Sequence, residues 1–295
     1  MSNIGQHIDY YMVQFWIEYG DKRSADYFMV RNGLYGPLAT LIGYFILVTQ
    51  IGPRWMSGRK PFDLKVILLA YNCLMVLLNM WFFSETLRNY RFGLDMFDFE
   101  YPRSDDLSKS AMQKVSMCQF YLMSKYLDLL DTIFFVLRRK QSQVTKLHLY
   151  HHISVPLLGW IVLRVVPTNG PVIIFALLNT LIHVVMYSYY TLAALGPSLR
   201  PYLWWKKYVT LLQIYQFVIY SIFSWLFAYR QRGYPLSLQL LACTQPIIFL
   251  ILFSQFYIRS YGNKSIVASR SDVSTLIKPL YFIINGRTNK IGRDG

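Results

Sequence analysis

The chain has 295 residues, of which 54% are hydrophobic, 17% aromatic and only 15% charged. A soluble domain carries about a quarter charged residues, so this composition excludes an ordinary soluble protein and predicts a polytopic membrane protein. The formal net charge of +15 raises nucleic acid as a partner. The basic residues flank apolar segments, however, which favours membrane topology and anionic lipid and predicts no nucleic-acid partner.

Several windows are apolar over the length of about 20 residues that a bilayer-spanning helix needs. We predict seven spans, at residues 34–52, 64–83, 115–137, 148–166, 171–192, 205–229 and 236–258. Backbone amides in hydrocarbon must be satisfied internally, so these spans are helices and the predicted fold class is all-α. Residues 1–295 then form a single integral-membrane domain.

Three polar segments flank or interrupt the spans. Residues 1–33 lack the short apolar core and small-residue cleavage site of a signal peptide, so we expect the first span to act as its own insertion signal. Residues 84–114 mix aromatic with charged residues and are expected to fold against the other segments. The basic stretch 259–295 is expected to be a flexible tail.

Positive charges are unequally divided between the two sides of the predicted helices. The loops after spans one, three and five carry Arg54, Arg59, Lys60, Arg138, Arg139, Lys140, Lys146, Arg200, Lys206 and Lys207. The loops after spans four and six carry only Arg164, Arg230 and Arg232. The positive-inside rule therefore predicts a cytosolic C-terminus and a lumenal N-terminus. The sequon at Asn263 is then cytosolic and should stay unmodified.

The cysteines offer no reactive thiol. Cys73, Cys118 and Cys243 lie in or near apolar spans, without a neighbouring histidine or a metal-ligand spacing. We interpret them as packing residues. This removes the usual nucleophile for thioester chemistry.

Polar residues inside a span are costly and are functional candidates for that reason. In the third span, "KYLDLLDT" places Lys125, Asp128, Asp131 and Thr132 within an arc of about 120° on a helix. Lys125 and Asp128 could simply neutralise each other. Three ionisable groups and a threonine on one face exceed what a single structural ion pair needs.

Histidines dominate the fourth span. In "LHLYHH", His148, His151 and His152 cover about 100° of one helical face. In the fifth span, "NTLIHVVMYSYY" places His183 four residues after Asn179. Tyr187 follows on the same face, where interhelical hydrogen bonding is the competing interpretation.

The sixth span contributes "TLLQIYQ", with Thr210, Gln213 and Gln216 at intervals of three; structural hydrogen bonding explains it as well as function does. With the predicted topology, the polar faces of all four helices lie at one depth in the cytosolic half of the membrane. This level is an active-site layer or an ion-binding one.

The histidine spacing H-x-x-H-H also occurs in membrane desaturases and hydroxylases, whose di-iron centre needs several such boxes. This chain has only five histidines, and His7 lies on the opposite side. A di-iron oxygenase is therefore excluded, whereas one zinc held by the remaining histidines and aspartates is not. Histidine's other uses are proton transfer and nucleophilic attack.

The four motifs, in this order and spacing, resemble the signature motifs of the ELO family, the very-long-chain fatty-acid elongases of the endoplasmic reticulum. The resemblance implies a 3-oxoacyl-CoA synthase that condenses a long-chain acyl-CoA with malonyl-CoA, releasing carbon dioxide and CoA, with no cofactor. It also implies a fold in which six spans enclose an acyl tunnel and one packs outside. The chain looks more like the animal branch that elongates saturated and unsaturated chains.

The sequence departs from the family's pattern at three places. Asp128 stands where the family usually has Glu, and Lys146 stands where an aromatic residue is common. The ending "KIGRDG" lacks a dilysine retrieval signal, so residence in the endoplasmic reticulum membrane rests on the resemblance.

The chemistry implied by the resemblance can be distributed over these residues. We assign His151 as the nucleophile that forms an acyl-imidazole, and His183 with Asn179 as the group facing the malonyl unit or the oxyanion. His148 and His152 would orient the pair or move protons, and Asp128 and Asp131 would fix imidazole tautomers. The remaining candidates for substrate binding are Lys125, Thr132, Arg138, Arg139, Lys140, Lys146, Tyr187, Tyr190, Lys206, Lys207, Thr210, Gln213 and Gln216.

Two alternatives stay open at this stage. The histidines can serve only as acid–base groups in a direct acyl transfer, or the chain can be a receptor or a proton-coupled transporter. The expected partners are acyl-CoA, malonyl-CoA and the lipid bilayer. A homodimer and contact with the ketoacyl reductase, dehydratase and enoyl reductase of the elongation cycle are left open.

Overall fold

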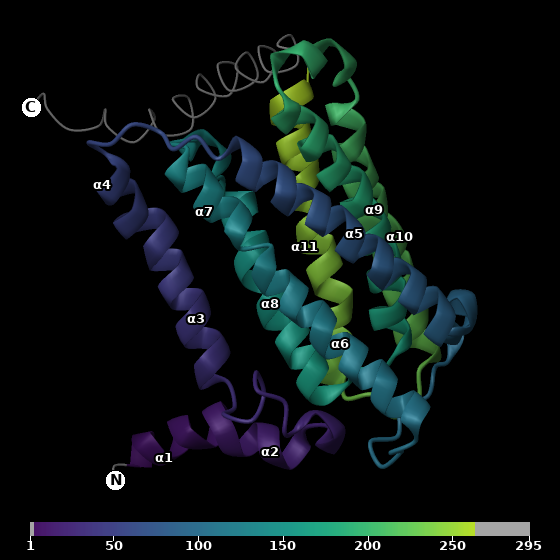
Figure 1. Ribbon diagram of the computed structural model, residues 1–295. Helices are drawn as coiled ribbons and strands as arrows, with labels where there is room; N and C mark the ends of the chain where they lie inside the picture. Colours follow the sequence, from purple (N-terminus) through teal and green to yellow (C-terminus); the bar gives the residue numbers. More distant parts are fainter. Residues whose placement is uncertain (1–2, 263–295) are drawn as a thin grey trace, which may run out of the picture. The chain divides into compact units, whose positions relative to one another are not determined.

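A computed structural model describes residues 3–262 (Figure 1). The chain divides into two compact units, Met1–Phe253 and Ser254–Gly295, and the relationships below are those within the first unit. Most of the expected tail at 259–295, together with Asn263, lies outside the described residues.

The described residues form helices whose connections are mostly short, apart from the long one between Asn89 and Lys109. An N-terminal segment comprises α1 (Asn3–Asp9), a π-helix (Tyr10–Gln14) and α2 (Phe15–Tyr19). The longer helices are α3 (Tyr35–Ile46), continued by a π-helical turn (Leu47–Ile51) into α4 (Gly52–Met56), then α5 (Lys65–Asn89), α6 (Lys109–Leu127), α7 (Leu130–Leu137), α8 (Lys146–Val165), α9 (Gly170–Leu195), α10 (Lys206–Arg230) and α11 (Leu236–Tyr261). Within residues 3–262 the only β pairing is an isolated bridge between Glu100 and Arg232.

Five of these segments are long and apolar enough to cross a membrane by length and composition: Tyr35–Met56, α5, α9, α10 and α11. The part of the chain that the structure describes is thus all-helical, and its several apolar helices indicate a multi-pass membrane protein. The other two predicted spans correspond to α6 with α7 and to α8. Their lysine, aspartate and histidine side chains make them more polar, so the count of seven spans remains a prediction.

The third predicted span is not one continuous helix, which corrects the expectation for 115–137. Leu129 donates its backbone N–H to Tyr126 and Asp131 donates to Asp128, both in the tighter i→i−3 pattern at 3.2 Å. This turn separates α6 from α7 without glycine or proline. It coincides with Asp128, whose side chain is held by Lys125 and Tyr187.

Side-chain caps set where the site-bearing helices begin. Thr145 accepts the backbone N–H of His148, so α8 begins at Lys146 and places all three of its histidines in the first two turns. Asn169 caps α9 through the N–H of Val172, and Pro171 stands in the first turn, where a missing N–H is tolerated.

Helix α9 is the most enclosed of the five candidate spans. In its most apolar window 61% of the residues are buried, against 22–28% in the other four. It packs along α5 on one side and α10 on another, whereas α6 packs against α8 (Figure 1). The polar face of α9 therefore lies inside the helical bundle.

The N-terminal segment packs against the C-terminal end of α8. Trp160 donates its indole N–H to the carbonyl of Met29 at 2.7 Å and packs edge-on against Trp16. The guanidinium of Arg164 donates to the carbonyl of Asp21 at 2.6 Å. The long polar connection also folds back, since the hydroxyl of Tyr101 donates to the carbonyl of Val165 at 3.1 Å.

Candidate active site

A buried polar cluster joins α6 and α7 to α9. The ammonium of Lys125, 3% exposed, donates to Asp128 Oδ2 at 2.9 Å. The hydroxyl of Tyr187 lies 3.2 Å from Asp128 Oδ1 and 2.9 Å from Asp131 Oδ2. A buried ion pair is tolerated only when its remaining lone pairs and protons are satisfied, and Tyr187 supplies part of that satisfaction. The turn between α6 and α7 thus brings both aspartates onto one tyrosine.

The orientation of the Asn179 amide follows from its partners. Tyr121 donates its hydroxyl to Asn179 Oδ1 at 2.6 Å, and Lys125 lies 3.5 Å from the same oxygen. Because an ammonium can only donate, this atom is the carbonyl oxygen. The amide nitrogen therefore faces His183 Nε2, 3.2 Å away, and that ring nitrogen accepts.

The tautomer of His183 is settled by this hydrogen bond. If Nε2 accepts, the ring proton of neutral His183 is on Nδ1. His183 Nδ1 is buried and has no hydrogen-bond partner in the structure. A buried donor without an acceptor is costly. It is therefore a natural place for a substrate oxygen to bind.

The ring of His152 in α8 contacts the rings of both His148 and His151. The ring centroids of His148 and His152 are 4.1 Å apart, and those of His151 and His152 are 5.3 Å apart. His148 Nε2 is 2.8 Å from the Thr132 hydroxyl, and His152 Nδ1 is buried without a partner. His151 packs against Phe249 of α11, with ring centroids 5.6 Å apart.

The other candidates occupy different settings. Thr210 and Gln216 are buried, and the amide nitrogen of Gln216 has no partner. Gln213 makes its contact with the sulfur of Met186, 3.5 Å away, and not with a histidine. Tyr190 packs edge-on against Tyr187.

The predicted cationic rim is half-buried or exposed at helix ends. Arg138 is half-buried at the C-terminal end of α7. Arg139 donates to the carbonyl of Arg59 at 3.1 Å, and the ammonium of Lys207 lies over the ring of Tyr208. The exposed members are Arg139, Lys140, Lys146, Lys206 and Lys207.

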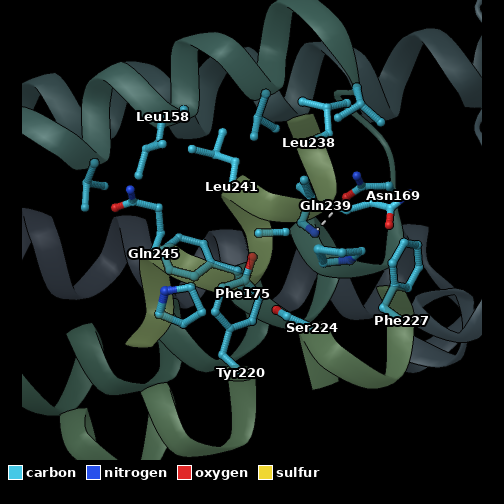
Figure 2. A pocket seen from close by; sticks show the side chains of 18 of the residues that line it. Leu158, Asn169, Phe175, Tyr220, Ser224, Phe227, Leu238, Gln239, Leu241 and Gln245 are labelled. Carbon is cyan, nitrogen blue, oxygen red and sulfur yellow. Dashed lines mark hydrogen bonds between the residues drawn. The ribbon is translucent and has the colours of Figure 1, made fainter. Parts of the chain in front are cut away.

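A cavity of about 160 Å³, partly open to the outside, lies between α6, α8, α9, α10 and α11 (Figure 2). Its walls are overwhelmingly apolar, with residues such as Leu158, Phe175 and Leu241. Asn169, Gln239 and Phe227 lie together at one end in Figure 2. Within the described part of the chain, Lys125 is the one predicted site residue that lines the cavity.

The histidines of α8 (His148, His151 and His152, called the histidine layer below) adjoin the opposite end of this cavity. Phe249, which His151 contacts, lines the wall, and so does Val155, one turn along α8 from His151. Tyr121, the hydrogen-bond donor to Asn179, lines it too. Single side chains, such as Tyr121 and Phe249, thus separate the polar cluster and the histidines from the long apolar cavity.

Sequence reasoning missed two tyrosines that complete the cluster. Tyr121 stands one turn before Lys125, so helical periodicity could have found it. Tyr44, in α3, lies 2.5 Å from the Thr132 hydroxyl, and no sequence pattern connects these residues. Among residues 3–262, no three or more His, Cys, Asp or Glu side chains are grouped in a way that could hold a metal.

Comparison with known proteins agrees with the motifs. The family model described as "GNS1/SUR4 family", ELO, matches residues 32–268. The chain belongs to the ELO family. Curated members of this family cover most of the chain and are named very long chain fatty acid elongases.

Three relatives illustrate the likeness. Very long chain fatty acid elongase 7 of Rattus norvegicus is 37% identical over 255 residues, covering 83% of this chain and 87% of the relative. Elongase 4 of Mus musculus is 36% identical, covering 82% and 77%. Elongase 5 of Rattus norvegicus is 34% identical, covering 91% and 88%. The ELO match includes every candidate site residue named above.

Proposed function

We propose that this protein is a very-long-chain 3-oxoacyl-CoA synthase, which adds two carbons from malonyl-CoA to a long-chain acyl-CoA. The observation that carries the proposal is the group of buried and half-buried histidines next to one end of a long apolar cavity. Membership of a family whose curated relatives are named elongases supports it. Acyl-CoA and malonyl-CoA are then the substrates.

The cavity supports a binding site for the acyl chain. In this proposal seven spans cross the membrane, and six of them, from α5 to α11, enclose a tunnel. The lining residues come from α6, α8, α9, α10, α11 and the connections before α9 and before α11, and none comes from the described α3, α4 or α5. Helix α5 instead packs along α9, which does line the cavity. This fits a first span that packs outside the tunnel.

The first half-reaction is an acyl transfer to His151. A ring nitrogen of neutral His151 attacks the thioester carbonyl, the new bond is N–C and the C–S bond breaks. The imidazole proton leaves with the thiolate, so free CoA is released as a thiol. His183 Nδ1–H, the donor without an acceptor, serves mainly the next half-reaction, in which it binds the oxygen of the malonyl unit as the enolate charge develops.

The second half-reaction consumes malonyl-CoA. Cleavage of its carboxylate C–C bond releases carbon dioxide and leaves the electron pair on an enolate, which attacks the acyl-imidazole. The N–C bond to His151 breaks, and the imidazole nitrogen takes back a proton. His152, in contact with both His151 and His148, forms the proton route together with His148.

The test separates the two half-reactions. Acyl-CoA alone should release a burst of CoA and add one acyl mass to the protein. His151→Ala should abolish both results, and His183→Ala should weaken the second half-reaction more than the first. His7→Ala, in the exposed N-terminal helix, is the matched control and should change neither.

Other outcomes separate the competing mechanisms. If the wild type releases CoA only after malonyl-CoA is added, direct transfer replaces the covalent route. If malonyl-CoA labelled in its retained carbon gives no labelled 3-oxoacyl-CoA with folded protein, the enzyme assignment fails and a transporter or receptor takes its place.

We further propose the endoplasmic reticulum membrane as the location, with a lumenal N-terminus and a cytosolic C-terminus. The basic residues then meet the phosphates of cytosolic CoA at the entrance. The test is glycosylation: Asn263 should stay unmodified in microsomes. A glycan on Asn263 in the native chain would reverse the orientation.

A further inference from the structure

A hydrogen-bond chain connects the first long helix to the histidine layer. The Tyr44 hydroxyl of α3 lies 2.5 Å from Thr132 Oγ1, and Thr132 Oγ1 lies 2.8 Å from His148 Nε2. Tyr44 is 6% exposed and Thr132 is fully buried. Water therefore has little access to replace either hydroxyl.

Apolar packing fixes the position of Tyr44. It belongs to a buried cluster formed by α3, its continuation into α4, and α7, against which side chains of α8 also pack. The buried members are Leu41, Tyr44, Val48, Met56, Leu129 and Val136. A helix that lines no part of the cavity thus presents one polar atom to the site.

We propose that Tyr44 is a positioning residue, whose hydroxyl holds Thr132 toward His148 and thereby fixes which ring nitrogen of His148 carries the proton. The inference rests on the proposed function, since it supplies a role for His148 in that reaction.

Each hydroxyl has one proton, which makes the chain directional. If Tyr44 donates to Thr132, Thr132 donates to His148 Nε2 and the ring proton is on Nδ1. If Thr132 instead donates to Tyr44, His148 Nε2 must carry the proton. Either direction selects a single tautomer.

Removing the Tyr44 hydroxyl releases Thr132. A helical threonine readily turns its hydroxyl to the carbonyl four residues earlier, which here is that of Asp128. His148 would then lose its partner and populate both tautomers. Because His148 contacts His152 and His152 contacts His151, the proton route to the acyl-bearing ring would be present in only part of the molecules.

A purely structural role for Tyr44 predicts different behaviour. In that case the hydrogen bond to Thr132 only satisfies the buried hydroxyl of Tyr44. Removing that hydroxyl then changes the stability of the protein but not its turnover. Tyr126 provides the matched control, because its buried hydroxyl has no partner and its ring packs against the same cluster. Tyr126→Phe should therefore leave turnover unchanged.

The experiment compares Tyr44→Phe, Thr132→Val, the double variant and Tyr126→Phe in the full chain. Tyr44→Phe should lower kcat for 3-oxoacyl-CoA formation by about threefold to tenfold, the effect of one hydrogen bond, with KM for both substrates unchanged. The double variant should be no slower than Thr132→Val alone, because both remove the same chain. Independent effects that multiply, or a Tyr44→Phe enzyme as fast as Tyr126→Phe, would overturn the proposal.

A second measurement does not depend on turnover. Nitrogen-15 NMR of protein labelled in histidine should show a single tautomer for His148 in the wild type and in Tyr126→Phe, but a mixture in Tyr44→Phe. If the wild type lacks condensing activity and this difference is present, the proposed function fails while the positioning role of Tyr44 stands. An unchanged His148 tautomer in Tyr44→Phe would refute that role whatever the activity.

Discussion

Asn179 Nδ2 lies 3.2 Å from His183 Nε2, one turn further along α9. The opposite atom of the same amide is held by Tyr121 and Lys125, both of which donate to it. Asn179 therefore links two side chains of α6 to His183, which lies on α9 like Asn179 itself. It leaves His183 with an N–H that has no partner until a substrate arrives.

Replacing Asn179 by leucine should lower kcat while leaving the protein folded. Leucine has a similar volume but no donor, so His183 is free to carry its proton on either nitrogen. The loss should approach that of one oxyanion-binding donor, on the order of a hundredfold. Measured kcat with the thermal unfolding temperature checks this, and Thr180→Val on the neighbouring position is the control. Comparable losses in both variants would mean that packing, and not the amide, matters.

We expect the stability of the protein to depend on pH through Asp95, which lies in the connection after α5. Burial raises the pKa of the Asp95 carboxyl, but the hydrogen bond from Arg91 and the charge of Lys114 outweigh burial, so this pKa lies below its ordinary value. A depressed folded-state pKa stabilises the protein above the unfolded value of about 3.9. That contribution is lost as pH falls through the lower, folded-state pKa.

Asp95→Asn should accordingly reduce the free energy of unfolding at pH 7, by no more than about 1 kcal/mol because the pairs are partly solvated. The difference from the wild type should shrink as pH falls below the unfolded value. Asp105→Asn, in a fully exposed pair with Arg103, should change nothing. Thermal melts of the three proteins between pH 7 and pH 3 test this; a difference that grows in acid would contradict it.

The N-terminal segment should contribute substantially to stability through Asp21. Its carboxylate binds the Arg23 guanidinium at 2.6 Å, with both side chains 3% exposed, and its carbonyl accepts from Arg164. Asp21→Asn leaves a buried guanidinium unpaired, which should cost about 3 kcal/mol of unfolding free energy. The exposed Asp26→Asn is the control. Activity per folded molecule should be preserved, and a stable but inactive Asp21→Asn protein would place this segment in the reaction instead.

Helical periodicity was enough to group the residues of each motif, but not to orient them. The spacing of Lys125, Asp128 and Asp131 placed them on one face, yet the helix ends and restarts within that motif. No glycine or proline marks the break. It accompanies side-chain bonds to Tyr187, which lies 59 residues beyond Asp128 and so cannot be read from local sequence.

Tyr44 shows the same limit more clearly. Tyrosine is common in this chain, with 24 copies, so a tyrosine in an apolar span carries no distinguishing pattern. Its partner Thr132 is 88 residues away. Only the packing of α3 against α7 and α8 brings the two hydroxyls together. By contrast, two stretches that join successive predicted spans, 165–173 and 228–238, contribute Val166, Val172, Ala228 and Tyr234 to the cavity wall.

These wall residues lead to a prediction about product length. Along α8 the cavity runs from Val155 to Val166, roughly 16 Å at the helical rise, which accommodates about a dozen carbons of an extended chain. Ala228 lines the cavity on α10, next to Phe227 at the end far from the histidines. Ala228→Phe should fill that end and shorten the space by a few carbons. The longest products should therefore shorten, while turnover of short acyl-CoA stays near the wild-type value.

Chromatography of products from a mixture of acyl-CoA lengths measures the effect directly. Leu226→Phe is the matched control, because Leu226 is exposed on the outer side of α10 two residues away and the substitution adds bulk without entering the cavity. Its product distribution should equal that of the wild type. If Ala228→Phe leaves the product lengths unchanged although the protein folds, the acyl chain does not extend toward Asn169 and Gln239. If it abolishes turnover of short and long substrates alike, the substitution has disturbed the histidine layer, and the proposed separation between reaction site and chain-end site is wrong.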